Sequence, residues 1–325
     1  MIFYYCPDSE IKSAGIRRLY EHINALVESG FNAAILHDKS TFYRKDLADV
    51  PVFGLDQKGI LKQKDIVVFP EGFPGLMAEF KDIPVRKMVI CLNWAYVFKS
   101  LKERITWRDF NIERVLGASE YTTEMIAWAM KLPSHVIVNQ INEKLYFRSP
   151  LESKKKKIVF ISRKGQQVPL LMRALHSRNP EFINKFEWVG LEGVSEEEFA
   201  QHVREASIFL NVSMEEGLAH ACFEAMRSGT LLCGYSSIGG QRTFIGGGET
   251  QNSIIAETGD YLSLAWLMEP LLEDLIEENY SEWQTILDQA YNDTLHMNPE
   301  NFKQQLTTLW KRLAPHELNQ SAEVK

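Results

Sequence analysis

Two glutamates that flank the start of a predicted helix, Glu216 and Glu224, are the residues best suited to chemistry. An apolar strand-like run ends at Val212, a loop with Gly217 follows, and the next residues, 219–228, have helical periodicity. Free N–H groups at a helix start favour a bound anion. Carboxylates are strong acceptors for paired hydroxyl groups. The segment therefore suits a ligand with hydroxyl groups on both sides of a diphosphate.

Several common catalytic motifs are absent from the sequence. It contains no GxxxxGK[ST], no GxGxxG, no HExxH and no GxSxG pattern. The eight histidines are scattered, without the spacing of metal ligands. These absences disfavour P-loop phosphotransfer, an ordinary NAD site, zinc hydrolysis and nucleophile-elbow hydrolysis. We expect no cofactor and no metal.

The elements that must position the two glutamates alternate between short apolar runs and helical patterns. Such alternation is typical of βαβ units around a parallel sheet, whose strands are buried on both faces. In the first half we predict strands at 2–6, 31–37, 65–69, 87–93, 114–119 and 135–139, with helices at 16–29 and 122–131. In the second half we predict strands at 158–162, 186–191, 208–212, 231–235 and 253–256, with helices at 169–177, 196–205 and 219–228. Three further helices are predicted at 261–277, 280–295 and 299–313.

The segment 148–157 is polar, contains a proline and ends in four lysines, so it resembles a linker between domains. We therefore predict an α/β protein with two tandem Rossmann-like domains, over 1–150 and 151–300. Ligands of such sheets bind outside the carboxyl ends of the strands, which predicts a cleft between two facing domains. Residues 301–325 would supply a C-terminal helix that packs back on the first domain and a frayed tail.

Composition and charge narrow the class of protein. The chain has 325 residues and a net charge of −7, so no global basic field favours nucleic acid. The four cysteines form no CxxC pair and suggest buried thiols in a reducing compartment. No secretory signal and no membrane-spanning run is present. We expect a cytoplasmic protein.

The stretch from Glu216 onward resembles the E-x7-E signature of GT-B glycosyltransferases, most closely retaining family 4, whose usual form is EGFGLxxxEAMAxGxPVV. Glu216-Gly217 and Glu224-Ala225-Met226, followed by Gly229, stand in register with it, and Ala219 replaces the second glycine. The resemblance extends to other segments of the chain, namely Ser13-Ala14-Gly15, Ser119-Glu120-Tyr121, Val138-Asn139 with Phe147, and Phe160-Ile161-Ser162-Arg163-Lys164-Gly165.

The resemblance implies a donor site in the second domain. Glu224 would hold the ribose hydroxyls of a nucleoside-diphosphate sugar, and Glu216 would hold the hexose. Arg163 and Lys164 would neutralise the diphosphate. The backbone of Gly217, Leu218 and Ala219 would also contact the hexose, and Gly239-Gly240 would allow close approach.

The first domain would contribute a second group of residues. By the same resemblance, Gly15 lies in a glycine loop after the first strand. Arg17 is a candidate phosphate contact. Asn93 is a further candidate site residue, since Asn93-Trp94 replaces the histidine that the family has after its fourth strand. Segment 98–107 mixes apolar and basic residues, so contact with a membrane surface is an open alternative to ordinary packing.

We therefore expect a metal-independent glycosyltransferase of the EC 2.4 type. It would move a sugar from a nucleoside-diphosphate sugar to a hydroxyl of a saccharide or lipid-linked acceptor, with retention, in glycan or polysaccharide biosynthesis. Two alternatives stay open, a non-catalytic nucleotide-sugar-binding protein of the same fold and an enzyme like the sugar-nucleotide 2-epimerases.

Overall fold

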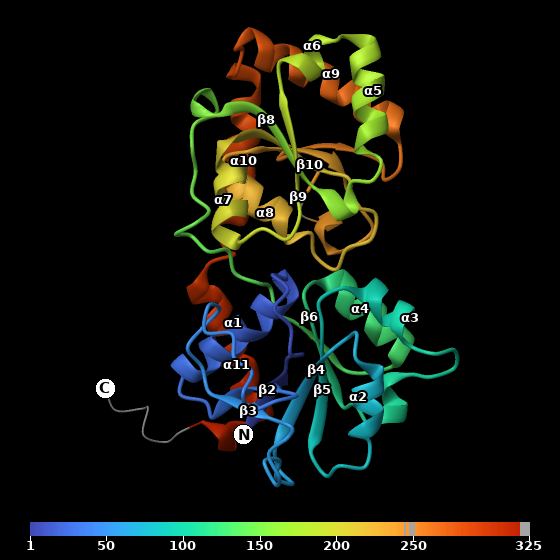
Figure 1. Ribbon diagram of the computed structural model, residues 1–325, viewed down its shortest axis with the longest axis vertical. Coiled ribbons are helices and arrows are strands. Elements are labelled where there is room, and N and C mark those ends of the chain that lie inside the picture. The colour runs from blue at the N-terminus through green and yellow to red at the C-terminus, as the bar shows by residue number, and fades with distance from the viewer. Residues whose placement is uncertain (244, 247–250, 319–325) are drawn as a thin grey trace. The chain divides into compact units, whose positions relative to one another are not determined.

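The computed structural model describes residues 1–243, 245–246 and 251–318. The chain divides into two compact units (Figure 1). The first unit comprises Met1–Gln140 together with the segment that begins at Pro299, and the second comprises Ile141–Asn298. The first unit is therefore discontinuous in sequence. Each unit is built around its own parallel sheet.

The sheet of the first unit has seven parallel strands in the order β3-β2-β1-β4-β5-β6-β7. The strands are β1 (Ile2–Tyr5), β2 (Ala33–His37), β3 (Val52–Gly54), β4 (Ile66–Pro70), β5 (Arg86–Cys91), β6 (Arg114–Gly117) and β7 (Ser134–Val136). Strand order reverses direction between β1 and β4, as in doubly wound folds.

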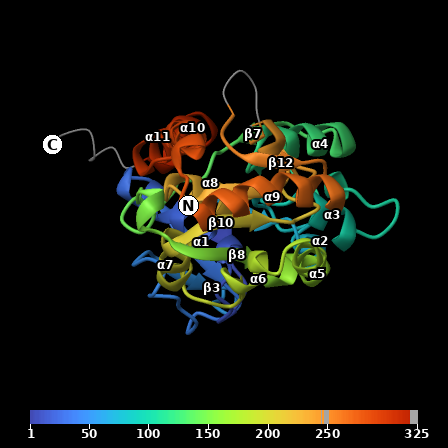
Figure 2. The ribbon, with the colours of Figure 1, turned by 90° about the horizontal axis from the view of Figure 1, so that it is seen from above.

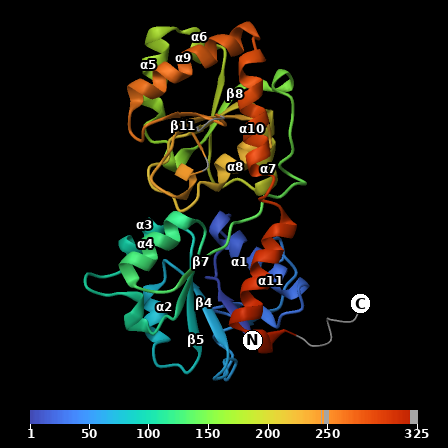
Figure 3. The ribbon, with the colours of Figure 1, turned by 180° about the vertical axis from the view of Figure 1, so that it is seen from behind.

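Helices cover both faces of this sheet. Helices α1 (Ala14–Glu28) and α11 (Pro299–Leu313) lie side by side on one face, and α2 (Pro74–Glu79), α3 (Trp94–Ser100) and α4 (Glu120–Met130) lie on the other (Figures 1 and 3). Alternate residues of β1 enter the two cores, with Tyr4 beneath α1 and α11 and Phe3 on the opposite face. Since both faces are covered, the strand is apolar throughout.

The sheet of the second unit has five parallel strands in the order β12-β11-β10-β8-β9. The strands are β8 (Lys155–Ile161), β9 (Glu187–Leu191), β10 (Ala206–Asn211), β11 (Leu231–Tyr235) and β12 (Ile254–Ala256). Here the strand order reverses between β8 and β10. Numbered within the unit, this is the flavodoxin-like order 2-1-3-4-5.

The helices of the second unit also form two layers. Helices α5 (Val168–Arg178) and α9 (Tyr261–Glu277) pack together on one face, with α6 (Glu181–Asn184) beside α5 (Figures 1 and 2). Helices α7 (Glu196–Glu205), α8 (His220–Arg227) and α10 (Gln284–Thr294) lie on the other face (Figures 1 and 3). Ile208 and Leu210 of β10 point into the α5–α9 core, whereas Phe209 meets Phe199 of α7.

Among the described residues, four strands and α-helices were not indicated by the sequence patterns, namely β3, α2, α3 and α6. Strand β3 is only three residues long, and its side chains Val52 and Phe53 are half-buried. Helices α2 and α3 are too short to show a helical period, because each spans two turns or fewer. Within the described ranges, no helix is both long and apolar enough to cross a membrane.

Candidate functional site

The reversal of strand order in the second sheet brings two loops together. One follows β8 and forms a short 3₁₀ turn, Ser162–Lys164, and the other follows β10 and leads into α8. Ligands of open α/β sheets bind at such a point, outside the carboxyl ends of the strands. The turn carries Arg163 and Lys164, and the loop carries Glu216. Topology thus places two cations and one carboxylate at the same edge of the sheet.

Lys164 and Glu216 form an ion pair across this edge, from Nζ to Oε1. The Glu216 side chain is 7% exposed and that of Lys164 is 21% exposed, so Glu216 is buried while Lys164 keeps some contact with water. Arg163 is exposed and pairs with no carboxylate among the residues that the structure describes. Of the two predicted phosphate-binding cations, Lys164 is therefore held in place by Glu216, while the guanidinium of Arg163 is open to solvent.

Helix α8 begins beside this pair. Its N-cap is Ala219, so no side chain caps the first turn. Glu224 is buried on this helix, and its Oε1 lies 3.6 Å from Nε2 of His220. Burial raises the pKa of the Cys222 thiol. The charges of Glu216 and Glu224 raise it further, and the charge of Lys164 lowers it. The thiol is therefore protonated.

The loop that carries Glu216 forms backbone hydrogen bonds with the loop after β11. The N–H of Glu216 donates to the carbonyl oxygen of Ile238 at 3.0 Å, and the N–H of Gly240 donates to that of Gly217 at 3.0 Å. A Cβ atom at Gly239 would lie 1.8 Å from the carbonyl oxygen of Glu216, so only glycine allows this approach. The two predicted glycines, Gly239 and Gly240, therefore fix the backbone around Glu216.

A buried network of hydrogen bonds, which the sequence did not indicate, supports the same two loops. The Asn211 Nδ2 donates to the carbonyl oxygen of Tyr235 at 2.8 Å and to Oγ of Ser237 at 3.1 Å. The Ser237 hydroxyl donates to the carbonyl oxygen of Ser213 at 2.6 Å. The signal available in the sequence is an asparagine that ends an otherwise apolar strand, which is costly unless its amide is paired.

The remaining predicted donor residues lie in the same segment. Gly217 and Ala219 are buried, and Leu218 is half-buried between them. All residues predicted to bind the donor therefore belong to the second unit, whereas Gly15, Arg17 and Asn93 belong to the first.

In the first unit, Gly15 lies inside the first turn of α1 rather than before it. Ser13 caps this helix, and its Oγ accepts from the N–H of Gly15 at 3.2 Å. A Cβ atom at Gly15 would meet only ordinary contacts, the nearest being Oγ of Ser13 at 3.5 Å. Arg17 follows in the same turn, where its Nε lies 3.7 Å from Oε1 of Glu21.

Asn93 caps the short helix α3. Its Oδ1 accepts from the N–H of Ala95 at 2.9 Å, and its own N–H donates to Oε1 of Glu71 at 2.8 Å. The Asn93 side chain is buried with only a small exposed fraction. Next to it, the ring of Trp94 lies 5.9 Å from that of Tyr121.

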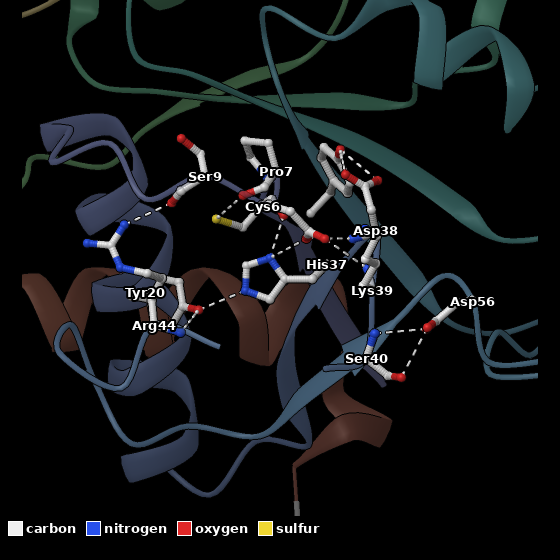
Figure 4. A network of polar contacts seen from close by, with 12 residues as sticks. Cys6, Pro7, Ser9, Tyr20, His37, Asp38, Lys39, Ser40, Arg44 and Asp56 are labelled. Atoms are coloured by element: carbon white, nitrogen blue, oxygen red, sulfur yellow. Dashed lines mark hydrogen bonds and ion pairs between the residues drawn. The ribbon is translucent and has the colours of Figure 1, made fainter. Parts of the chain in front are cut away.

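A polar network holds the loop that connects β1 to α1 (Figure 4). The buried His37 contacts the carbonyl oxygen of Cys6 through Nδ1 at 2.7 Å and the hydroxyl of Tyr20 through Nε2 at 2.8 Å. Because burial lowers the pKa of His37, the ring is neutral, with Nδ1 donating and Nε2 accepting. Arg44 donates to the carbonyl oxygen of Ser9 at 2.9 Å. This network fixes the loop that leads to Gly15.

The described residues contain no group of three or more histidine, cysteine, aspartate or glutamate side chains arranged to hold a metal ion. The second-unit site carries two cationic side chains, Arg163 and Lys164. Such positive charge suits an anionic group.

Comparisons with known proteins define the class of protein. The solved structure of sucrose-phosphate synthase from Thermosynechococcus elongatus has a TM-score of 0.70 and 12% identity, and the match covers 97% of this chain and 99% of that one. A glycosyltransferase from Rickettsia africae ESF-5 matches with a TM-score of 0.67 and 16% identity over 96% and 98% of the chains. HepE from Anabaena, solved with UDP, matches with a TM-score of 0.67 and 15% identity over 96% and 100%.

A curated relative is similar in sequence. The alpha-1,6-glucosyltransferase of Actinobacillus pleuropneumoniae serotype 7 is 25% identical over 249 residues, which cover 72% of this chain and 72% of the relative. No family model matches the chain. Together the comparisons confirm two predictions, the GT-B fold and the glycosyltransferase class.

Proposed function

We propose that this glycosyltransferase moves glucose from UDP-glucose to a hydroxyl group of a saccharide or lipid-linked acceptor, with retention and without a metal ion. The choice of donor is supported by HepE, which has been solved with UDP and with UDP-glucose, and by the named glucosyltransferase. Retention is supported by the resemblance to family 4. A role in polysaccharide assembly belongs to the same proposal.

One observation carries the proposal: the juxtaposition of Lys164 and Glu216 at the point where the second sheet reverses its strand order. A cation for a phosphate and a carboxylate for a sugar hydroxyl are the two groups that a nucleotide-sugar requires at its sugar–diphosphate junction. Glu224, one turn into α8, would accept from the ribose hydroxyls at the other end of the diphosphate.

The chemistry follows from where charge develops. Glycosyl transfer breaks the bond between C1 of the sugar and the diphosphate oxygen, so negative charge grows on the departing UDP. Lys164 and Arg163 would stabilise that charge as it forms, which lowers the barrier selectively. No metal ion is then needed to neutralise the leaving group.

The two units would divide the work. The second would bind the donor through Lys164, Glu216 and Glu224, and the first would bind the acceptor near Gly15, Arg17 and Asn93. In the segment proposed to touch a membrane, Phe98 is 44% exposed and Ile105 is 37% exposed. An acceptor carried on a lipid would fit such a surface.

The donor can be identified by thermal unfolding of the full chain with UDP, GDP, dTDP and their glucose conjugates. A ligand that binds only the folded state raises the melting temperature by mass action. We expect stabilisation by UDP and UDP-glucose and little by GDP or dTDP. A preference for another nucleotide would refute the choice of donor, and stabilisation by none of them would refute the donor site.

Transfer can be followed by NMR with UDP-glucose and a set of 4-nitrophenyl hexosides in both anomeric forms. We expect an α-linked product, and an unchanged rate in excess EDTA. A β-linked product would refute retention, and loss of activity that added Mg²⁺ restores would refute metal independence. Nucleotide binding without hydrolysis or transfer would indicate a non-catalytic binding protein, and isotope exchange at C2 without transfer would indicate an epimerase.

A further inference from the structure

Glu71 is a buried carboxylate at the edge of the first sheet. It follows β4 directly, and β4 is one of the two strands between which the order of this sheet reverses. The residue is 6% exposed, and its backbone N–H continues the pairing with β5 by donating to the carbonyl oxygen of Ile90 at 3.1 Å. Glu71 thus occupies, in the first unit, the kind of position that the ligand-binding loops occupy in the second.

Glu71 forms no ion pair with any residue that the structure describes, which is unusual for a carboxylate this deeply buried. Its Oε1 accepts from the backbone N–H of Asn93 at 2.8 Å. Burial raises the pKa of Glu71 to about 7, and the N–H groups of its own backbone, Asn93 and Leu92 oppose that shift. Within the described ranges, the partners of this buried carboxylate are therefore backbone N–H groups and not a cationic side chain.

The neighbouring side chain complements Glu71. The Asn93 Oδ1 is engaged as the cap of α3, so its Nδ2 group is the part left to donate. The space beside Gly72, the residue after Glu71, is open, because a Cβ atom there would have no other atom within 4 Å. An acceptor oxygen and an amide donor thus stand together at the carboxyl edge of the sheet. One hydroxyl group can donate to the first and accept from the second.

We propose that Glu71 and Asn93 bind a sugar hydroxyl group of the acceptor, with Glu71 accepting its hydrogen bond and the Asn93 amide donating to its oxygen. This inference rests on the proposed function, since it assigns the acceptor side of the same reaction. It adds Glu71, a residue that the sequence motifs did not single out. Glu71 is a binding residue in this proposal and takes no part in bond breaking.

The test compares Glu71→Gln with wild type in the full chain, using UDP-glucose and the 4-nitrophenyl hexosides. Glutamine keeps an oxygen for the Asn93 N–H and removes the charge that makes a carboxylate the stronger acceptor. We expect the KM for the hexoside to rise about tenfold, which corresponds to about 1.4 kcal/mol. The affinity for UDP and the hydrolysis of UDP-glucose without acceptor should change less than about twofold. Glu113→Gln is the matched control, because Glu113 is an exposed carboxylate of the same unit.

A second variant protects the test against a folding defect. Asn93→Ser keeps a side chain that caps α3 and removes the amide donor, so it should also raise the hexoside KM. An unchanged hexoside KM in both variants would overturn the inference, as would an equal loss of acceptor-independent hydrolysis. If no hexoside accepts glucose, saturation-transfer NMR measures hexoside binding directly, and binding that is absent or insensitive to Glu71→Gln overturns it too. Failure of UDP to bind the wild type would instead refute the proposed function.

Discussion

The ion pair between Lys164 and Glu216 makes a specific prediction for Glu216→Gln. In the free protein Glu216 is the counter-ion of Lys164, so a bound diphosphate must compete with Glu216 for that cation. The substitution removes the competitor and also removes the carboxylate proposed to hold the hexose. Affinity for UDP, which lacks the hexose, and turnover of UDP-glucose should therefore move in opposite directions.

The magnitudes follow from the exposure of the pair. Because Lys164 is 21% exposed, we take the free energy of its ion pair with Glu216 as about 1 kcal/mol, near the upper end for solvent-accessible ion pairs. Releasing Lys164 should then tighten UDP binding by at most about fivefold. Losing a charged acceptor for a sugar hydroxyl costs about 1.5–3 kcal/mol. The kcat/KM for UDP-glucose should fall by about 10- to 150-fold.

Calorimetry with UDP and initial rates with UDP-glucose measure the two quantities on the same preparation. Glu215→Gln is the matched control, since Glu215 is the exposed neighbour of Glu216. UDP affinity that falls about tenfold or more in Glu216→Gln would refute the competition between Glu216 and the diphosphate. Unchanged turnover would refute the assignment of Glu216 to the hexose.

Three further predictions concern other residues of the two units. Glu224→Gln should weaken UDP binding by about 1–3 kcal/mol, measured by calorimetry, because the ribose hydroxyls lose a charged acceptor; unchanged affinity would contradict that role. Gly239→Ala should destabilise the chain by about 1–3 kcal/mol and weaken UDP-glucose binding, because the new methyl group would lie 1.8 Å from the carbonyl oxygen of Glu216. Gly75→Ala, where a Cβ meets no atom within 4 Å, should leave thermal stability equal or higher, and equal effects of the two alanines would contradict the steric argument. Glu71 has a pKa of about 7 in the folded chain against an ordinary 4.5, so the folded state binds more protons between those values and wild type loses stability as pH rises through them. The free energy of unfolding of Glu71→Gln relative to wild type, from urea titrations, should therefore rise by at most about 3 kcal/mol between about pH 4 and about pH 8, and a flat difference would contradict the raised pKa.

The parallel sheets were predictable because their strands are buried on both faces. Residues 2–5 and 208–210 are continuous apolar runs, and the structure places both in inner strands of a sheet. Strand β3 was not predicted because it is a short edge strand with half-buried side chains, and its sequence pattern differs little from that of a loop. The short helices α2 and α3 were not predicted either, because they are too short to show a helical period.

The site was predictable only in part. The spacing of Glu216 and Glu224 around a helix start is visible in the sequence, because it is local. The ion pair from Lys164 to Glu216 is not, because it joins residues that are neighbours only through the strand order. The same holds for Glu71, whose burial and contact with Asn93 depend on pairing between β4 and β5.

The last long helix of the chain, α11, supplies Phe302, Leu306 and Trp310 to the core beneath β1. During synthesis on a ribosome, every residue of the second unit emerges before these three side chains do. The second unit can therefore reach its native state while the first still exposes the apolar face of α1. The usual order, in which the amino-terminal part of a protein matures first, is reversed here. A premature stop codon just before Pro299 would spare the second unit and remove Phe302, Leu306 and Trp310 from the core of the first.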